Sequence, residues 1–168
     1  DNDGIFDEFG ITGDLTHDYG VAGTYTVAIQ GEFSRIYFNN GGDAKKIVAI
    51  NQWGGNAWTS MERAFFGCEN LEIPATDIPD LSAVTSMKRM FQNAYSINDN
   101  INNWDVSNIT DMSNLFLNAT AFNQPLDVWD VGNVTDMTWM FFGSQFNQPI
   151  GNWNVSNVKS MKGMFELA

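Results

Sequence analysis

Apolar side chains return at a fixed interval through the second half of the chain. The stretches INNWDVSNITDMSNLF, LDVWDVGNVTDMTWMF and IGNWNVSNVKSMKGMF align so that Trp104, Trp129 and Trp153 share one column, 25 and then 24 residues apart. A fixed period in this range is typical of stacked-repeat proteins. We therefore predict about five repeats of 24–26 residues over residues 53–168. Two further columns carry the pattern: Met61, Met87, Met112, Met137 and Met161, and Phe65, Phe91, Phe116, Phe141 and Phe165.

The repeat at residues 101–125 shows the elements that we expect in each unit. Apolar and polar side chains alternate over residues 101–106, which predicts a strand. Thr110 and Asp111 suit a helix start, and Met112 begins an i, i+3, i+4 apolar stripe. Each unit thus combines a strand with a short helix, so we predict an α/β fold. Stacked units bury their apolar faces against their neighbours. It would be a solenoid with a parallel strand sheet on one side and short helices on the other.

The N-terminal third has a different pattern. Residues 24–29 alternate between polar and apolar side chains, and a turn at Gly31 separates them from a second apolar run at residues 33–38. Two such runs predict a β-hairpin. An end unit of a repeat stack would expose its apolar face without a cap. We therefore predict that residues 10–52 form a β-rich cap.

Residues 1–9 are acidic and have two interpretations. Asp1, Asp3, Asp7 and Glu8 place hard oxygen ligands at the short spacing that calcium prefers. The run resembles the end of a thrombospondin type 3 calcium repeat, which implies that these four carboxylates would bind calcium. The alternative is a solvated acidic linker that binds no metal. We expect no other cofactor.

The charge balance narrows the classes of partner. The chain has 8 Lys and Arg against 20 Asp and Glu, a net charge of −12. Nucleic-acid binding and anionic membrane surfaces both require clustered basic residues, so we expect neither partner. No apolar run reaches the roughly 18 residues of a membrane-spanning helix, so we expect no direct insertion. Cys68 is the single cysteine, which excludes an intramolecular disulfide.

The strand face of the repeats is the first candidate binding surface. Carboxylates stacked about 4.8 Å apart repel one another unless they are bridged, so the row would take cations, sugar hydroxyls or a basic peptide. In the alternative, each side chain accepts a hydrogen bond from the backbone of the following bend, as Asx residues commonly do. The row consists of Asp80, Asp105, Asp130 and Asn154, with Asn103 and Asn152 beside it.

An aromatic pair is the second candidate surface. Trp139 lies two residues after Met137 and Phe142 three residues further on, both outside the predicted inward stripe. A patch of exposed apolar side chains commonly marks an interaction site. The alternatives are local packing beneath a loop and an interface with the next module.

The sequence carries no catalytic motif. It lacks G-x-S-x-G, a P-loop and H-E-x-x-H, and His17 is its single histidine. A glycosidase requires two carboxylates at a set separation, and nothing in the repeats singles out a pair. We therefore expect no enzymatic activity and no catalytic residue.

Several motifs resemble those of bacterial surface proteins. Ala64, Phe65, Cys68 and Leu71 occupy the A-F-x-x-C-x-x-L positions of the BspA-like leucine-rich repeat. The units at 101–168 are similar to the W-D-V-S-N-V-T-D-M-x-x-M-F repeat of surface lipoproteins. The text HDYGVAGTYTVAI is similar to the last strands of PKD-like extracellular β-sandwiches.

This resemblance implies a leucine-rich-repeat-like solenoid in a larger adhesin, outside the cell or on the bacterial surface. The implied partners are a host or neighbouring-cell surface protein, a peptide or a glycan, together with adjacent modules of the same chain. One alternative is a structural spacer or module-docking domain with no ligand of its own. Another is a polysaccharide-active accessory domain.

Overall fold

The structure is a computed structural model that describes residue 10 and residues 16–168. The chain divides into two units, Asp1–Phe33 and Ser34–Ala168. In the first unit, none of the described residues lies in a helix or strand. Its described residues include an aromatic cluster, in which the rings of Tyr19 and Tyr25 stack with centroids 4.2 Å apart.

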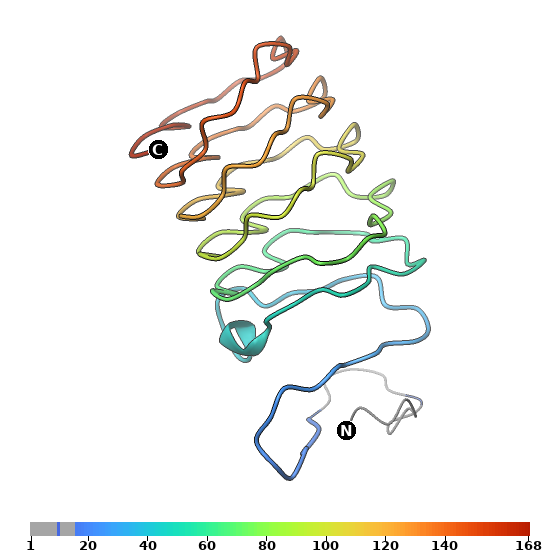
Figure 1. Cartoon of the computed structure of the whole chain (residues 1–168). Helices are drawn as coiled ribbons and strands as arrows, with labels where there is room; N and C mark the ends of the chain where they lie inside the picture. The colour runs from blue at the N-terminus through green and yellow to red at the C-terminus, as the bar shows by residue number, and fades with distance from the viewer. Residues whose placement is uncertain (1–9, 11–15) are drawn as a thin grey trace. The chain divides into compact units, whose positions relative to one another are not determined.

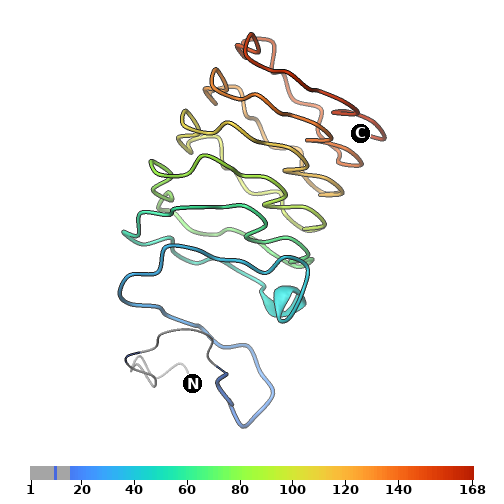
Figure 2. The ribbon, with the colours of Figure 1, turned by 180° about the vertical axis from the view of Figure 1, so that it is seen from behind.

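Residues 34–168 wind into a succession of stacked coils, which Figure 1 and the reverse view in Figure 2 both show. The one helix among the described residues is the 3-10 helix η1, Ala44–Lys46. The β-structure consists of isolated parallel bridges with no named strand. These bridges pair Arg35 with Ser60, Ala49 with Glu72, Ala57 with Asp80, Ser86 with Asp111, Asp111 with Asp136, and Asp136 with Ser160.

Backbone hydrogen bonds join each coil to the next in an alternating pattern. The N–H groups of Met61, Arg63, Phe65 and Gly67 donate to carbonyls of the next coil over 2.9–3.4 Å. Of the N–H groups between them, those of Ala64 and Phe66 donate to carbonyls three residues earlier in their own coil, and that of Glu62 donates to the Ser60 hydroxyl. Because the same alternation recurs in the three following coils, every second N–H bonds between coils and the others close tight turns. The equivalent segments are residues 87–93, 112–118 and 137–143.

The predicted short helices are wrong. In each turn segment the backbone adopts a left-handed conformation at the third residue, with φ of 52–59° at Arg63, Arg89, Asn114 and Trp139. An α-helix needs φ near −63° at every residue, so it cannot continue through these positions. The predicted parallel sheet is also wrong, because only isolated bridges form among the described residues. The chain is therefore not an α/β, leucine-rich-repeat-like solenoid with a sheet and helices.

The β-rich character predicted for the cap is wrong as well. Within residues 10–52, the described backbone contains single bridges at Arg35 and Ala49, and η1. Val27 and Ile29, apolar residues of the first predicted strand, are 68% and 56% exposed. Alternation alone predicts a strand, but no bridge forms along residues 24–29. Residues 34–52 belong to the same compact unit as the repeats.

No helix in the described part of the chain has the length and apolar character that crossing a lipid bilayer requires.

The repeating apolar columns form the core of the stacked coils. The methionines at 61, 87, 112 and 137 are fully buried, and the phenylalanines at 65, 91, 116 and 141 are at most 1% exposed. The phenylalanine rings stack from one coil to the next, with centroids 5.6–5.9 Å apart along the column from Phe65 to Phe165. Each buried ring contributes about 1.5–3 kcal/mol by removal from water. Identical side chains therefore hold the coils in register.

The tryptophan column adds side-chain hydrogen bonds between coils. The indole N–H of Trp129 donates to the carbonyl of Ile101 over 3.1 Å, and that of Trp153 to Leu126 over 2.9 Å. Buried indole N–H groups require such partners. Each of these tryptophans is thus tied to the coil before it.

Candidate functional site

The predicted acidic row lies at the bends that follow the tryptophan column. All four side chains are exposed, yet each uses its Oδ1 atom inside the fold. Each oxygen accepts the backbone N–H two residues later, which is the Asx-turn alternative expected from the sequence. The pairs are Asp80 with Ser82 at 3.0 Å, Asp105 with Ser107 at 3.0 Å, Asp130 with Gly132 at 2.9 Å, and Asn154 with Ser156 at 3.2 Å.

These hydrogen bonds shift the titration of two members of the row. Bonds from Ser82, first through its side chain and then through its backbone N–H, lower the pKa of the Asp80 carboxyl. Ser107 lowers the pKa of Asp105 in the same way. Both interactions favour the ionised carboxylate. The two groups are therefore charged at neutral pH, with one oxygen already committed to its own bend.

Asparagine side chains connect the bends of successive coils. The Nδ2 group of Asn108 donates to the carbonyl of Ser82 over 3.1 Å. Asn133 and Asn157 repeat this contact one and two coils later, at 2.7 Å each. These amides link each bend to the previous one. The acidic row therefore lies along a continuous edge whose bends are hydrogen-bonded from coil to coil.

The neighbouring row is also part of this edge. Asn152 donates to the carbonyl of Asp127, while Asn103 is exposed. A contact beside them was not predicted from the sequence: Asn102 Nδ2 donates to Asp127 Oδ1 over 2.9 Å. Asn102 and Asp127 are 25 residues apart, which is one repeat, and this spacing could have predicted the contact. The polar groups at this edge thus bond largely to one another across coils.

The aromatic pair lies on the turn segment at residues 137–143. Trp139 is 36% exposed and Phe142 is half-buried. The Nζ of Lys162 lies 5.6 Å from the centre of a Trp139 ring, within cation–π range. A Cβ added to Gly163 would lie 2.4 Å from the indole Cδ1, so the ring sits directly against this glycine. Sequence reasoning missed both neighbours, although Gly163 follows Trp139 by one repeat of 24 residues.

The backbone at Trp139 is strained. Its φ is 52°, in the left-handed region that costs an ordinary residue about 1–2 kcal/mol. Asn114 and Gly163 occupy the same column of neighbouring coils, and both residue types tolerate this conformation. Arg63 and Arg89 adopt the same conformation in earlier coils, so the left-handed backbone belongs to the repeat, and Trp139 is the aromatic residue of this column. The fold thus holds an exposed tryptophan where asparagine or glycine would be more stable.

The two predicted surfaces remain separate. Among the described residues, no hydrogen bond, ion pair or ring contact joins Trp139 or Phe142 to the acidic row. The structure therefore presents two independent candidates on one stack of coils.

The predicted calcium ligands Asp1, Asp3, Asp7 and Glu8 lie outside the described residues. Within the described part, no group of three or more His, Cys, Asp or Glu side chains could hold a metal ion. Calcium binding by the N-terminal run stays a prediction.

Coils joined by backbone bonds, with polar edges and an exposed aromatic turn, define a repeat protein whose candidate contacts lie on its lateral surfaces. The chain belongs to the family described as "Mycoplasma protein of unknown function, DUF285", which matches residues 48–168. No curated protein and no solved structure matches the chain. The match supports the predicted membership of a bacterial repeat family. The PKD-like text at residues 17–29 lies outside it and stays a prediction.

Proposed function

We propose that the chain is a ligand-binding, adhesive module of a larger bacterial surface protein, located outside the cell. It acts by binding, without catalysis. Its partner is a protein, peptide or glycan of a host or neighbouring cell, contacted through Trp139 and Phe142. The resemblance of the repeats to those of surface lipoproteins supports this location and class of partner.

The exposed indole of Trp139 is the observation that carries the proposal. Burying an aromatic side chain at an interface contributes strongly to affinity, and tryptophan is enriched at the centres of binding sites. The acidic row is the weaker candidate, because each of its members already accepts a backbone hydrogen bond. We therefore assign the contact to the aromatic turn.

The substitution Trp139→Asn tests this assignment without an expected loss of stability. Asparagine tolerates the left-handed backbone, so the variant should unfold in urea at the same or a higher concentration than the parent chain. Binding to any glycan or matrix-protein peptide found on an array should weaken at least about tenfold, measured by titration calorimetry.

Arg89→Asn is the matched control, since Arg89 occupies the same column with φ of 57°. It should leave binding unchanged. Equal affinities for the Trp139→Asn variant and the parent would remove the aromatic turn from the proposal. A loss on Asp105→Ala or Asp130→Ala alone would move the contact to the acidic row.

A structural spacer is the second candidate function. Two observations favour it: the alternating backbone ladder, and the use of the acidic row in its own bends. A spacer would bind none of the glycans or matrix-protein peptides on an array. Any reproducible ligand that Trp139→Asn weakens would argue against it.

A further inference from the structure

Basic side chains gather on the turn segments of three successive coils, although the chain as a whole is acidic. Arg63 and Arg89 are the third residues of adjacent turn segments, Lys88 precedes Arg89, and a bridge from Arg35 to Ser60 joins the coil before them. These four basic residues, which we call the basic patch, are half of the 8 Lys and Arg in the chain. Backbone hydrogen bonds join the coils of Arg63 and Arg89 to a preceding and a following coil, so the patch lies on the lateral surface.

Tyr37 connects two guanidinium groups of the basic patch. The Cζ atom of Arg35 lies 4.4 Å from the centre of the Tyr37 ring, within cation–π range. On the other side, Arg63 Nη1 donates a hydrogen bond to the Tyr37 hydroxyl over 3.4 Å. Tyr37 is 48% exposed. The ring and the two guanidinium groups therefore form one accessible surface.

Half of the positive charge in the basic patch is not compensated. Two members form ion pairs at 3.6 Å, Arg63 with Glu62 and Lys88 with Asp111. Neither Arg35 nor Arg89 forms an ion pair with any residue that the structure describes. Two guanidinium charges thus remain for an anion from outside the chain.

Arg89 combines this free charge with unused hydrogen-bonding groups. Its Nε atom is buried without a hydrogen-bond partner, and so is Oε1 of Gln92, three residues later. Such atoms cost free energy until they are paired. Arg63 and Arg89 also start from neighbouring coils, about 4.8 Å apart, where like charges repel. The fold does not require cations in this column, because Asn114 and Gly163 hold the equivalent positions of later coils.

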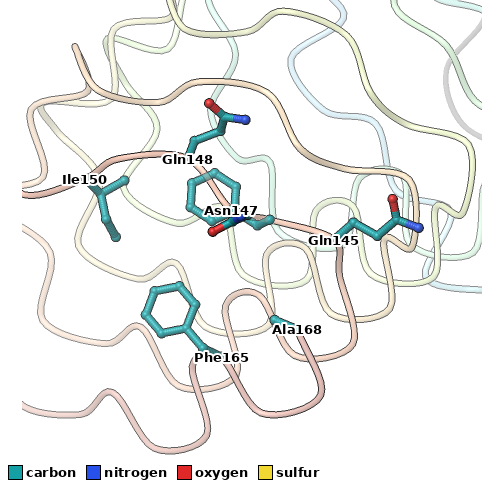
Figure 3. Close-up of a pocket in the computed structure, with 7 residues that line it drawn as sticks. Gln145, Asn147, Gln148, Ile150, Phe165 and Ala168 are labelled. Carbon is teal, nitrogen blue, oxygen red and sulfur yellow. The ribbon is translucent and has the colours of Figure 1, made fainter.

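The hollow shown in Figure 3 has a different character. Its volume is about 470 Å³, and Gln145, Gln148 and Ile150 are among the residues around it. The lining residues that the structure describes are apolar or carry amides, and none is Lys or Arg. This hollow offers no positive charge, so the basic patch is the better site for an anionic ligand.

We propose that the basic patch binds an extended acidic segment of a partner polypeptide. Guanidinium groups bind carboxylates through two parallel hydrogen bonds, and the two uncompensated groups match two carboxylates. A peptide group supplies both a carbonyl acceptor for Arg89 Nε and an N–H donor for Gln92 Oε1, once these half-buried side chains turn outward. The proposal goes beyond the adhesive contact at Trp139 and does not depend on it.

The overall charge selects a short acidic segment over a dense polyanion. A net charge of −12 repels nucleic acids and highly sulfated glycans, whose charge far exceeds what the patch can compensate. An acidic glycan would share the carboxylates but not the peptide groups. It is therefore the comparison ligand in the test.

The probe is the synthetic peptide acetyl-Gly-Glu-Gly-Glu-Gly-amide, in which alternation places both carboxylates on one side of an extended chain. It should bind saturably in an NMR titration, shift the Arg89 Nε–H signal, and bind more weakly in 150 than in 10 mM sodium chloride. The matched peptide with Gln in place of both Glu should not bind. No saturable shift with the Glu peptide, or an equal shift with the Gln peptide, would overturn the proposal.

Arg89→Asn should weaken binding of the Glu peptide at least about tenfold, because it removes charge-assisted hydrogen bonds. Asparagine tolerates the left-handed backbone, so the variant should keep the urea midpoint of the parent chain. Lys159→Asn is the charge-matched control and should preserve binding, since Lys159 is exposed and outside the basic patch. Equal losses in the two variants would reduce the effect to net charge and contradict a site at Arg89.

The aromatic turn and an acidic glycan provide the remaining comparisons. Trp139→Asn should leave binding of the Glu peptide unchanged, whereas a loss as large as that of Arg89→Asn would place the peptide on the aromatic turn. Ligands of the aromatic turn should in turn be insensitive to Arg89→Asn, so the two proposals can fail separately. A galacturonic acid oligomer that binds more tightly than the Glu peptide, and is lost in Arg89→Asn, would replace the polypeptide by an acidic glycan.

Discussion

Single residues set the geometry of each coil through their tolerance of unusual backbone angles and their short side chains. The left-handed positions accept arginine, asparagine and tryptophan, while Asp105 and its equivalents close the bends with one carboxylate oxygen. Sequence spacing predicted that these acidic side chains share a row, and Asx turns were one of the two interpretations it left open for them. It did not predict the left-handed column, because no single residue type recurs through all of its members.

The titration of Asp105 tests the Asx turn. The folded-state pKa is lowered, chiefly by the Ser107 side chain, so the stabilisation is present above the ordinary value of about 3.9. It is lost as the pH falls through the lower, folded-state pKa. Ser107→Ala should raise the Asp105 pKa, measured by NMR titration of its carboxyl carbon. The Asp80 titration serves as the control and should not move.

Cys68 provides a second test at the residue scale. The side chain is fully buried, and desolvation raises the thiol pKa to about 12. Since the thiolate is the reactive form, the folded chain should not react with a thiol reagent at pH 8. Reaction should occur on unfolding in urea, monitored by absorbance. Rapid labelling of Cys68 without denaturant would show that the coil around it opens in the folded protein.

At the scale of the element, the sequence predicted which side chains lie inside but not the backbone that carries them. Met112, Leu115 and Phe116 have helical spacing and are fully buried, as predicted. The observed segment is a double turn, that is, two successive tight turns. It also places residues i, i+3 and i+4 on one side, because the left-handed conformation at Asn114 changes the chain direction between them. Gly67 and Gly143, at the second left-handed column, were the clearest sequence signal of this turn.

Two glycine substitutions distinguish this double turn from a helix. Gly67 and Gly143 have φ of 81° and 64°, so alanine should cost each site about 1–2 kcal/mol of unfolding free energy. A Cβ at Gly67 would also lie 2.9 Å from the Asn40 Cα, whereas at Gly143 it meets the movable Asn118 Oδ1 at 2.8 Å. Gly67→Ala should therefore be the more destabilising in urea. Stabilisation by either variant would indicate a helix.

At the scale of the whole molecule, charge is unevenly distributed along the chain. Between Asn93 and Val158 there are six acidic residues and no Lys or Arg. Repulsion among like charges destabilises a compact state, and salt screens it. The sequence predicted this acidity, but not that Lys162 would lie over Trp139, because that contact depends on which coils become neighbours.

The urea midpoint of the chain should therefore rise when sodium chloride increases from 10 to 150 mM. The Debye length falls from about 30 to about 8 Å over this range, so repulsion between neighbouring coils weakens. Asp127→Asn should reduce the salt dependence, since it removes one of the exposed acids. A midpoint that falls with salt would show that attractive ion pairs dominate instead.

The alternating use of N–H groups gives the turn segments a direction. Donors point toward the following coil and acceptors toward the preceding one, so a coil inserted backwards would match neither neighbour. Excision of residues 112–136 would leave the Met87 bond to Asp111 in place and would offer Arg89 the Thr138 carbonyl that Asn114 used, so the donors and acceptors at the joint would still match. Removal or addition of a whole coil therefore preserves the match between donors and acceptors, whereas removal of half a coil does not.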